Sequence, residues 1–373
     1  MKKKILIVIP SLEIGGGAER VAASLTKKLA KKYTVFIITF YNFQKTYPYE
    51  GFYHSLNLKL KTWRRIFLPI NIFKVIQPIS PDLIISFLAH TNILIILIKI
   101  LFRMKIPLII CNHTNLKMAY KDRKKYINFF VKILYRLNWI KKIITISKEN
   151  HASLVNDYNI KKSLITTIHN GIDLQEIREL SNAEVNYRGI FENKEIIKFI
   201  TIGRLHELKR HRDLIIAFSR VKSEIINAKL FIIGDGSLRK ELEELIKQKD
   251  LENDIILLGL VENPYSYLSK SDIFVLSSKY EVFPMVLLEA LACGLPIIST
   301  NCKTGPQEIL NNGQYGILTK VMDSDELAEK MIYLAKNEDF REKYAKKSLE
   351  RAKIFDINNI SEEWFDLIDS YIG

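Results

Sequence analysis

Short apolar runs rich in β-branched residues alternate along the whole chain with stretches whose apolar residues recur at helical spacing. Strands that alternate with helices pair in parallel, and fully apolar strands are buried on both faces of a sheet. We therefore expect an α/β protein with helices on both faces of its sheets. The expected strands lie near residues 4–10, 34–39, 82–87, 107–111, 142–147, 164–169, 198–203, 229–234, 255–258, 273–277, 296–300 and 316–319.

The length of the chain indicates two domains. Its 373 residues are too many for one small core, and the 48% hydrophobic and 26% charged content is typical of a globular protein. The polar stretch 181–194 lacks periodicity and is the expected join. We predict two doubly wound, Rossmann-like domains, residues 1–185 and 186–354, that face each other across a cleft. Ligands of such sheets collect at the carboxyl ends of the strands.

Two glutamates mark one short predicted helix. Pro284 suits its first turn and Gly294 the position just past its end. Glu289 lies inside this helix among apolar side chains, where a carboxylate requires a partner, and Glu281 lies just before it. Together the two carboxylates can accept hydrogen bonds from the hydroxyls of a sugar and a ribose. A solvated loop glutamate with a core ion pair remains the structural alternative.

A basic turn follows the strand near 198–203. Arg204 and Lys209 lie in this turn, ahead of a predicted helix, with further cations up to residue 212. Cations at a helix N-terminus oppose its dipole, so their clustering indicates a bound anion. A solvated run of charge is the alternative. The turn Gly234-Asp235-Gly236 ends the next strand, and a tight turn alone would also explain it.

Two segments of the first half also follow strands. The glycines of Gly15-Gly16-Gly17 permit close approach of a ligand. They do not form the dinucleotide fingerprint, because Arg20 occupies its third glycine position. His113 follows the strand that ends near Cys111; a single histidine is more often a structural hydrogen-bonding group.

In this order, the motifs Gly-Gly-Ala-Glu-Arg (16–20), Gly-Arg-x4-Lys (203–209) and E-x7-E (281–289) resemble the family-4 retaining glycosyltransferases (glycosyl transferases group 1, GT-B architecture). The resemblance covers nearly the whole chain and extends to bacterial enzymes of lipid-linked oligosaccharide, capsule or lipopolysaccharide assembly. It implies transfer of a hexose or N-acetylhexosamine from a nucleotide sugar, with UDP favoured, to a saccharide acceptor that is lipid-linked or part of lipopolysaccharide. It also implies a C-terminal helix, about 355–373, that joins the first domain.

The resemblance assigns roles to individual residues. It implies that Glu281 contacts the donor sugar, Glu289 the ribose, His113 the transferred sugar, and Arg204 and Lys209 the diphosphate. These residues, apart from Glu289, form the expected catalytic set. The expected donor-binding set consists of Arg204, Lys209, Glu281 and Glu289 with Gly16, Gly17, Gly203, Gly234, Gly236, Phe283, Pro284 and Met285.

No cofactor or metal is expected. Asp323-Ser324-Asp325 fits a D-x-D metal pattern but precedes a helical stretch, where aspartate is a good N-cap. Three cysteines without metal-ligand spacing indicate reduced thiols in a cytoplasmic protein. The first ten residues are too briefly apolar for a signal peptide, and the apolar stretch 83–102 contains polar residues, which favours a strand and a core helix.

Charge is distributed unevenly. Residues 1–180 contain 30 lysines and arginines against 10 acidic residues, whereas residues 181–373 contain 26 against 31. The stretch 117–142 suits a basic amphipathic helix, with Lys121, Lys125, Lys132 and Arg136 on one side and Ile127, Phe130, Leu134 and Leu137 on another. A second basic and aromatic cluster lies within 59–67. We expect a monomer or weak dimer, peripheral on the anionic inner face of the cell membrane. A solvated surface helix is the alternative.

Three rival functions remain open. A sugar-nucleotide epimerase shares the two-domain plan and would convert the donor without an acceptor. A basic nucleic-acid-binding protein would fit the charge, but the sequence contains no recognised reader motif, and we expect no nucleic-acid partner. A silent sugar-binding module would not require Arg204, Lys209, Glu281 and Glu289 together.

Overall fold

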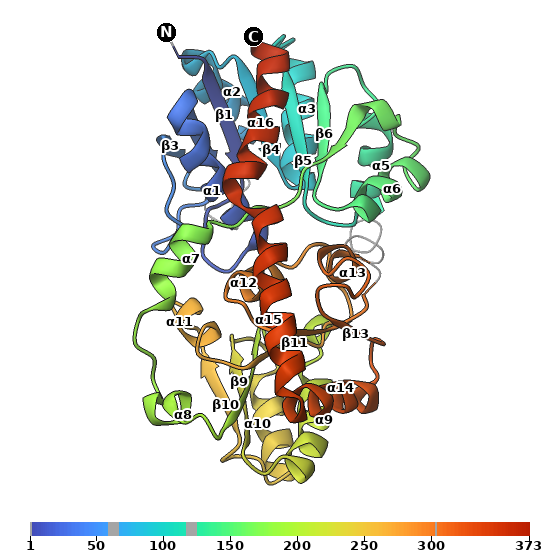
Figure 1. The fold of residues 1–373 in the computed structure, drawn as a ribbon. Coiled ribbons are helices and arrows are strands. Elements are labelled where there is room, and N and C mark those ends of the chain that lie inside the picture. The colour runs from blue at the N-terminus through green and yellow to red at the C-terminus, as the bar shows by residue number, and fades with distance from the viewer. Residues whose placement is uncertain (1, 59–66, 117–124, 303) are drawn as a thin grey trace. The chain divides into compact units, whose positions relative to one another are not determined.

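The computed structural model describes residues 2–58, 67–116, 125–302 and 304–373 and divides the chain into two compact units (Figure 1). The first unit contains Met1–Gly171 and Ile357–Gly373, and the second contains Ile172–Asp356. Residues 172–185, which the sequence places in the first domain, therefore belong to the second unit. Here Asn263 Nδ2 donates to Leu180 O at 2.7 Å and Ser269 Oγ to Ser181 O at 2.9 Å.

The first unit is built on a parallel seven-stranded sheet in the order β3-β2-β1-β4-β5-β6-β7. All six strands expected here are confirmed, and an edge strand, β3, was not predicted. The strands are β1 (Lys4–Ile9), β2 (Thr34–Thr39), β3 (Phe52–Ser55), β4 (Leu83–Phe87), β5 (Leu108–Asn112), β6 (Lys142–Thr145) and β7 (Ile165–Thr167). The order reverses between β1 and β4, which is where such a sheet places ligands.

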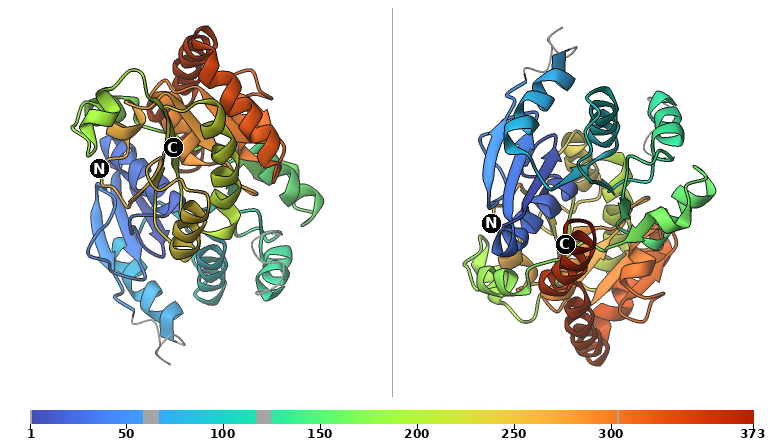
Figure 2. Two further views of the ribbon diagram at one scale, coloured as in Figure 1. Left: turned by 90° about the horizontal axis from the view of Figure 1, so that it is seen from below. Right: turned by 90° about the horizontal axis from the view of Figure 1, so that it is seen from above.

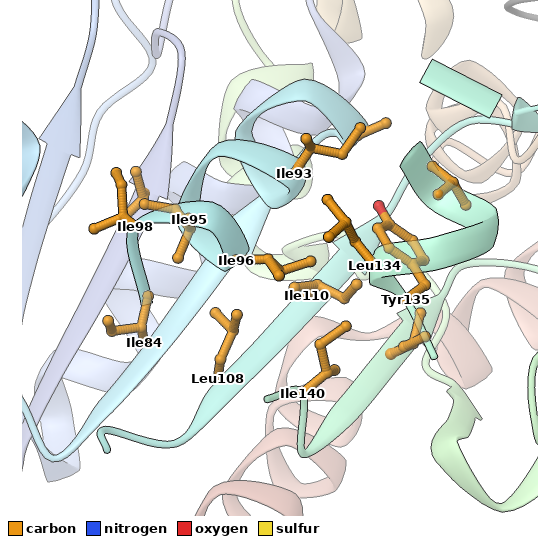
Figure 3. Close-up of a cluster of buried hydrophobic side chains, with 14 of the residues drawn as sticks. Ile84, Ile93, Ile95, Ile96, Ile98, Leu108, Ile110, Leu134, Tyr135 and Ile140 are labelled. Carbon is orange, nitrogen blue, oxygen red and sulfur yellow. The ribbon is translucent and has the colours of Figure 1, made fainter. Parts of the chain in front are cut away.

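Helices cover both faces of this sheet. α1 (Gly17–Lys32) and α16 (Ile357–Ile372) share one core with the odd-numbered residues of β1. The opposite core is formed by α2 (Leu68–Ile79), α3 (Ala89–Leu101), α5 (Lys125–Leu134) and α6 (Lys148–Asn156). In Figure 3, Ile96 of α3 and Tyr135 just after α5 lie over Ile110 of β5. Both views of Figure 2 show α2, α3 and α5 side by side, with α3 in the middle.

The apolar stretch 83–102 forms β4 and α3, as predicted. No helix in the described ranges is long and apolar enough to cross a membrane. Three polar side chains of α3, those of Thr91, Asn92 and Lys99, are buried, whereas His90 is exposed. Asn92 Nδ2 donates to Cys111 O at 3.0 Å, and the ammonium of Lys99 donates to Met104 O at 3.0 Å. Burial lowers the pKa of Lys99 to about 8.

The second unit has a parallel six-stranded sheet in the order β10-β9-β8-β11-β12-β13. All six expected strands are confirmed: β8 (Ile197–Ile202), β9 (Ala228–Ile233), β10 (Ile255–Gly259), β11 (Ile273–Leu276), β12 (Ile297–Thr300) and β13 (Ile317–Thr319). Its helices are α7 (Leu174–Ser181), α8 (Arg188–Glu192), α9 (His211–Glu224), α10 (Arg239–Gln248), α11 (Tyr265–Leu268), α12 (Met285–Ala292), α13 (Gly305–Ile309), α14 (Ser324–Lys336) and α15 (Glu338–Ala352). This order reverses between β8 and β11.

Stability of the first unit should depend on the C-terminal helix α16. Ile368 is fully buried in the core that α16 shares with α1, whereas Glu362 on the same helix is exposed. We predict that Ile368→Ala lowers the free energy of unfolding by about 2–5 kcal/mol, because it leaves a cavity. Glu362→Ala should change it by less than about 0.5 kcal/mol. Urea denaturation of both variants measures this, and equal stabilities would contradict it.

Candidate active site

The turns that follow β8 and β11 meet at the reversal of the second sheet. Arg204 and Lys209 follow β8, and Glu281 follows β11. Two hydrogen bonds hold these turns together. Ser277 Oγ donates to Lys209 O at 2.8 Å, and the backbone N–H of Lys279 donates to Leu208 O at 2.8 Å. Lys209 and the first predicted carboxylate are therefore brought together, and Arg204 lies in the same turn as Lys209.

The central contact of this site is an ion pair. Lys209 Nζ lies 2.5 Å from Glu281 Oε1, and the two side chains are only 26% and 11% exposed. Ser278, which is fully buried, donates its hydroxyl to the same carboxylate oxygen at 2.7 Å. A charge pair with so little solvent around it interacts more strongly than one on the surface.

Some cations of the basic run form ion pairs within the protein, and others are available to a ligand. Arg210 is held by Asp213, with bonds of 2.8 and 2.9 Å, and also contacts Glu207. Arg212 pairs with Glu241 at 3.3 Å. Arg204 is exposed, and within the described residues its guanidinium makes no hydrogen bond or ion pair. Arg204 is thus free to bind an anion, and Lys209 could do so by leaving Glu281.

The helix that contains Glu289 begins at Met285, one residue later than predicted, so Pro284 is its N-cap. Its predicted end is confirmed: Gly294 adopts a φ of +72°, in the left-handed region that suits a residue after a helix. Glu289 is 1% exposed. Phe283 is 5% exposed and packs edge-to-face on Phe355, with ring centroids 5.7 Å apart.

The turn Gly234-Asp235-Gly236 has a structural function. A Cβ on Gly236 would lie 2.4 Å from Leu205 O, and one on Gly234 would lie 2.0 Å from Gly203 O. Glycine at both positions therefore allows the turns after β8 and β9 to pack backbone to backbone. Gly203 differs, because a Cβ there would make ordinary contacts at 3.5 Å or more with Lys209 and His211.

The sequence did not single out His211, which begins α9 beside Gly203 and Lys209. Its side chain is 3% exposed, and burial lowers its pKa to about 4. Among the described residues, its Nδ1 has no hydrogen-bond partner. A neutral histidine at this position adds a polar atom beside the ion pair. Only the structure could identify it, since a histidine inside a run of charges gives no signal of burial.

A second group of predicted residues lies in the first unit. Gly15 has a φ of +117°, Gly16 is the N-cap of α1, and a Cβ on Gly17 would meet nothing within 4 Å. The backbone at Gly17 is therefore open to approach, at the carboxyl end of β1, whereas the side chain of Glu19 lies against Gly16.

His113 lies in a turn that two asparagines hold in place. Asn112 Nδ2 donates to Asn150 Oδ1 at 3.1 Å, and Asn150 Nδ2 donates to Asn112 O at 2.8 Å. The His113 ring stacks on Phe87 with centroids 5.3 Å apart. Part of the ring surface is accessible, but the surrounding protein lowers its pKa to about 4. His113 is thus neutral near pH 7.

Side chains cap three helices, and the first of these caps was predicted from the sequence. Asp323 Oδ1 accepts from Glu326 N at 2.9 Å and caps α14, and Asp173 caps α7 in the same way. Ser147 caps α6. No group of three metal-ligating side chains occurs in the ranges that the structure describes.

The basic helix differs from the prediction. α5 ends at Leu134, so Arg136 and Leu137 follow it. Lys121 and the cluster 59–66 lie outside the described residues, as does the side chain of Lys125. Lys132 and Arg136 are exposed, and Ile127, Val131 and Leu134 are buried. Phe130, expected on the buried side, is 37% exposed, because helical spacing places it beside Phe129 and Ile133 on the outer surface.

The glycine interpretation predicts a stability difference between two variants. Gly236→Ala should lower the free energy of unfolding by about 1–3 kcal/mol, because its methyl group overlaps the Leu205 carbonyl. Gly17→Ala, which meets open space, should not lower it. Chemical denaturation tests the pair, and a fully stable Gly236→Ala would refute the packing of the two turns.

Comparisons with known proteins agree with the motifs. The family Glycosyl transferases group 1 matches residues 184–351, and Glycosyltransferase Family 4 matches residues 15–176. An uncharacterized glycosyltransferase of Methanocaldococcus jannaschii is 36% identical over 81% of this chain and 82% of its own length.

Two further similarities cover almost the entire chain. The N-acetylgalactosamine-N,N′-diacetylbacillosaminyl-diphospho-undecaprenol 4-alpha-N-acetylgalactosaminyltransferase of Campylobacter jejuni is 30% identical over 97% of this chain and 98% of its own. The crystal structure of HepE from Anabaena in complex with UDP and glucose has a TM-score of 0.82 at 20% identity, covering 99% and 100% of the two chains. The chain therefore belongs to the family-4 (group 1) retaining glycosyltransferases and has their GT-B fold, and it is a nucleotide-sugar glycosyltransferase.

Proposed function

We propose that this enzyme transfers a hexose or N-acetylhexosamine from a UDP-sugar to a saccharide on a lipid carrier or on lipopolysaccharide. The observation that carries the proposal is the Lys209–Glu281 ion pair at the reversal of the second sheet, with Arg204 exposed in the same turn as Lys209. A diphosphate requires cations, and a sugar requires hydrogen-bond acceptors. The turns after β8 and β11 together offer both.

The donor site follows from these contacts. Arg204 and Lys209 bind the diphosphate, and Glu281 accepts hydrogen bonds from the sugar. Glu289 receives the ribose, while Gly203, Phe283, Pro284 and Met285 line the approach. Gly234 and Gly236 shape the site indirectly, since they allow the turn of Gly203 to pack. Gly17 offers open backbone from the first unit, and Gly16, the N-cap of α1, precedes it.

The reaction passes through an oxocarbenium-like state as the bond between the sugar and the diphosphate breaks. Arg204 and Lys209 stabilise the charge that develops on the leaving diphosphate, which is the largest contribution that fixed charges can make. They supply the positive charge that a metal would supply, and we propose a metal-independent reaction. Neutral His113 donates a hydrogen bond to the transferred sugar, and no carboxylate acts as covalent nucleophile.

A lipid-linked acceptor is supported by two Campylobacter jejuni relatives. Their names describe transfer of N-acetylgalactosamine to undecaprenol-linked saccharides, and they are 30% and 28% identical over nearly the whole of this chain. An acceptor of this kind is anchored in a membrane. The enzyme must then work at a bilayer surface.

The first unit offers a surface that fits an anionic bilayer. We define the membrane surface as the outward side of α2, α3 and α5, which lie side by side (Figure 2). Its exposed apolar side chains are Phe67 (48%), Ile70 (39%), Leu97 (40%), Ile100 (37%), Leu101 (65%), Phe129 (61%), Phe130 (37%) and Ile133 (46%). Its exposed cations are Lys74, Arg103, Lys105, Lys132 and Arg136, and these three helices contain no acidic residue. Apolar insertion and attraction to anionic lipid then act together, in a protein peripheral on the cytoplasmic face.

Loss of the ion-pair residues should abolish transfer without unfolding the protein. We expect Glu281→Gln and Lys209→Ala to reduce turnover at least about a hundredfold, since each removes a charge that acts at the reacting centre. Arg212→Ala is the matched control, because this nearby cation pairs with Glu241 instead. Product is measured with a UDP-sugar panel and an undecaprenol-linked saccharide acceptor. Full activity in either variant would refute the site, and donor conversion without acceptor would indicate an epimerase.

Membrane binding should depend on the apolar side chains of α3. In flotation with vesicles containing anionic lipid, the double change Leu97→Ser and Leu101→Ser should weaken binding at least about tenfold, because two exposed leucines that the bilayer would bury are lost. Ile226→Ser is the control, since Ile226 is 85% exposed but lies in the second unit. Salt should weaken wild-type binding. Equal flotation of wild type and double variant, or no wild-type binding at low salt, would refute the surface.

A further inference from the structure

The carboxylate of Glu281 has two donors in the free protein, and they differ in what a ligand would do to them. Within the described residues, its hydrogen-bond donors are Lys209 Nζ at 2.5 Å and Ser278 Oγ at 2.7 Å, both on Oε1. A diphosphate would draw the ammonium away. Ser278 is fully buried, so its hydroxyl cannot reach a bound nucleotide sugar and remains with the carboxylate.

Ser278 is fixed by the neighbouring strand. Its carbonyl accepts hydrogen bonds from Thr300 Oγ1 at 2.5 Å and from Cys302 Sγ at 3.0 Å. Thr300 ends β12 and is 3% exposed, and Cys302 is 1% exposed. Burial raises the pKa of the Cys302 thiol to about 11, so it stays a neutral donor. The hydroxyl of Ser278 therefore lies on a rigid segment, whereas Lys209 has a long and flexible side chain.

We propose that Ser278 is a positioning residue that holds Glu281 in place when Lys209 passes to the diphosphate. The inference rests on the proposed donor site and adds a sequence of contacts to it. In the free enzyme the carboxylate of Glu281 is paired with the ammonium of Lys209. On binding, the diphosphate replaces Glu281 at that ammonium, and Glu281 keeps the Ser278 hydrogen bond while its other oxygen accepts from the sugar.

The hydrogen bond from Ser278 keeps the carboxylate from turning into solvent during this exchange. A poorly solvated carboxylate that loses its only ammonium is destabilised unless another donor remains. Ser278 provides that donor without touching the substrate. Its hydroxyl should therefore matter more in the complex with a UDP-sugar than in the complex with UDP, in which water in place of the sugar can solvate Glu281 after Lys209 has left it.

The test is calorimetric binding of UDP and of UDP-N-acetylgalactosamine, or of the UDP-sugar that the panel selects, to wild type and Ser278→Ala, with steady-state kinetics. We expect Ser278→Ala to bind UDP within about twofold of wild type, to lose most of the added affinity for the UDP-sugar, and to lower kcat about tenfold, as loss of a hydrogen bond to a charged group does. A merely structural serine would weaken both ligands alike.

Two further variants complete the experiment. Ser348→Ala is the matched control, because Ser348 is also fully buried and donates to a backbone carbonyl, Leu295 O, at 2.7 Å. It should keep the wild-type ratio of the two affinities. Ser278→Thr retains the hydroxyl and should keep that ratio even if Ser278→Ala does not fold. A folded Ser278→Thr variant without the wild-type ratio of the two affinities would overturn the role of the hydroxyl.

The outcomes distinguish failure of the proposed function from failure of the Ser278 role alone. If wild type binds neither UDP nor any UDP-sugar, the proposed function fails and the role of Ser278 fails with it. If wild type binds both and Ser278→Ala keeps the wild-type affinities and kcat, only the positioning role is overturned.

Discussion

The functional account depends on one partly buried ion pair, Lys209 with Glu281. Its two side chains come from turns after adjacent strands, and backbone hydrogen bonds between those turns fix their separation. A charge shielded from water requires a partner, so the free protein satisfies each residue with the other. The same need makes the site selective: a ligand must offer an anion to the ammonium and hydroxyls to the carboxylate. A nucleotide sugar offers both.

The rest of the second unit supports this pair. The turns after β8 and β9 pack so closely that Gly234 and Gly236 have no room for a side chain. Arg210 is bound to Asp213, whereas Arg204 is exposed. Part of the positive charge of the basic run is thus used in ion pairs within the protein, and Arg204 is left for the diphosphate of the proposed donor. The first unit has a different charge pattern, with cations and apolar side chains on the outer side of α2, α3 and α5, in keeping with a substrate held in a membrane.

Much of this could be predicted from the sequence, because the strands are continuous apolar runs and every one of the twelve expected is present. The edge strand β3 was missed, since Phe52-Tyr53-His54-Ser55 lies at the edge of the sheet and half its residues are exposed. The helix α3 was read as a core helix, but it turns Asn92 and Lys99 inward and Leu97 and Leu101 outward. Composition cannot show which side of an apolar helix meets the sheet.

The sequence predicted which residues form the site, but it did not predict all of their contacts. Motif spacing identified Lys209 and Glu281, but their direct contact depends on which strands are neighbours, and that is a property of the fold. The hydroxyl of Ser278 and the buried ring of His211 gave no signal, because serine and histidine are common in solvated turns. The two glycines after β9 were recognised as a turn, and the structure adds the backbone that they must accommodate.

The most direct test is a crystal structure of the protein with UDP bound. The account predicts that Lys209 Nζ leaves Glu281 and lies within hydrogen-bonding distance of a diphosphate oxygen, with the guanidinium of Arg204 on the same group. A structure in which UDP binds elsewhere while the Lys209–Glu281 pair stays intact would contradict it.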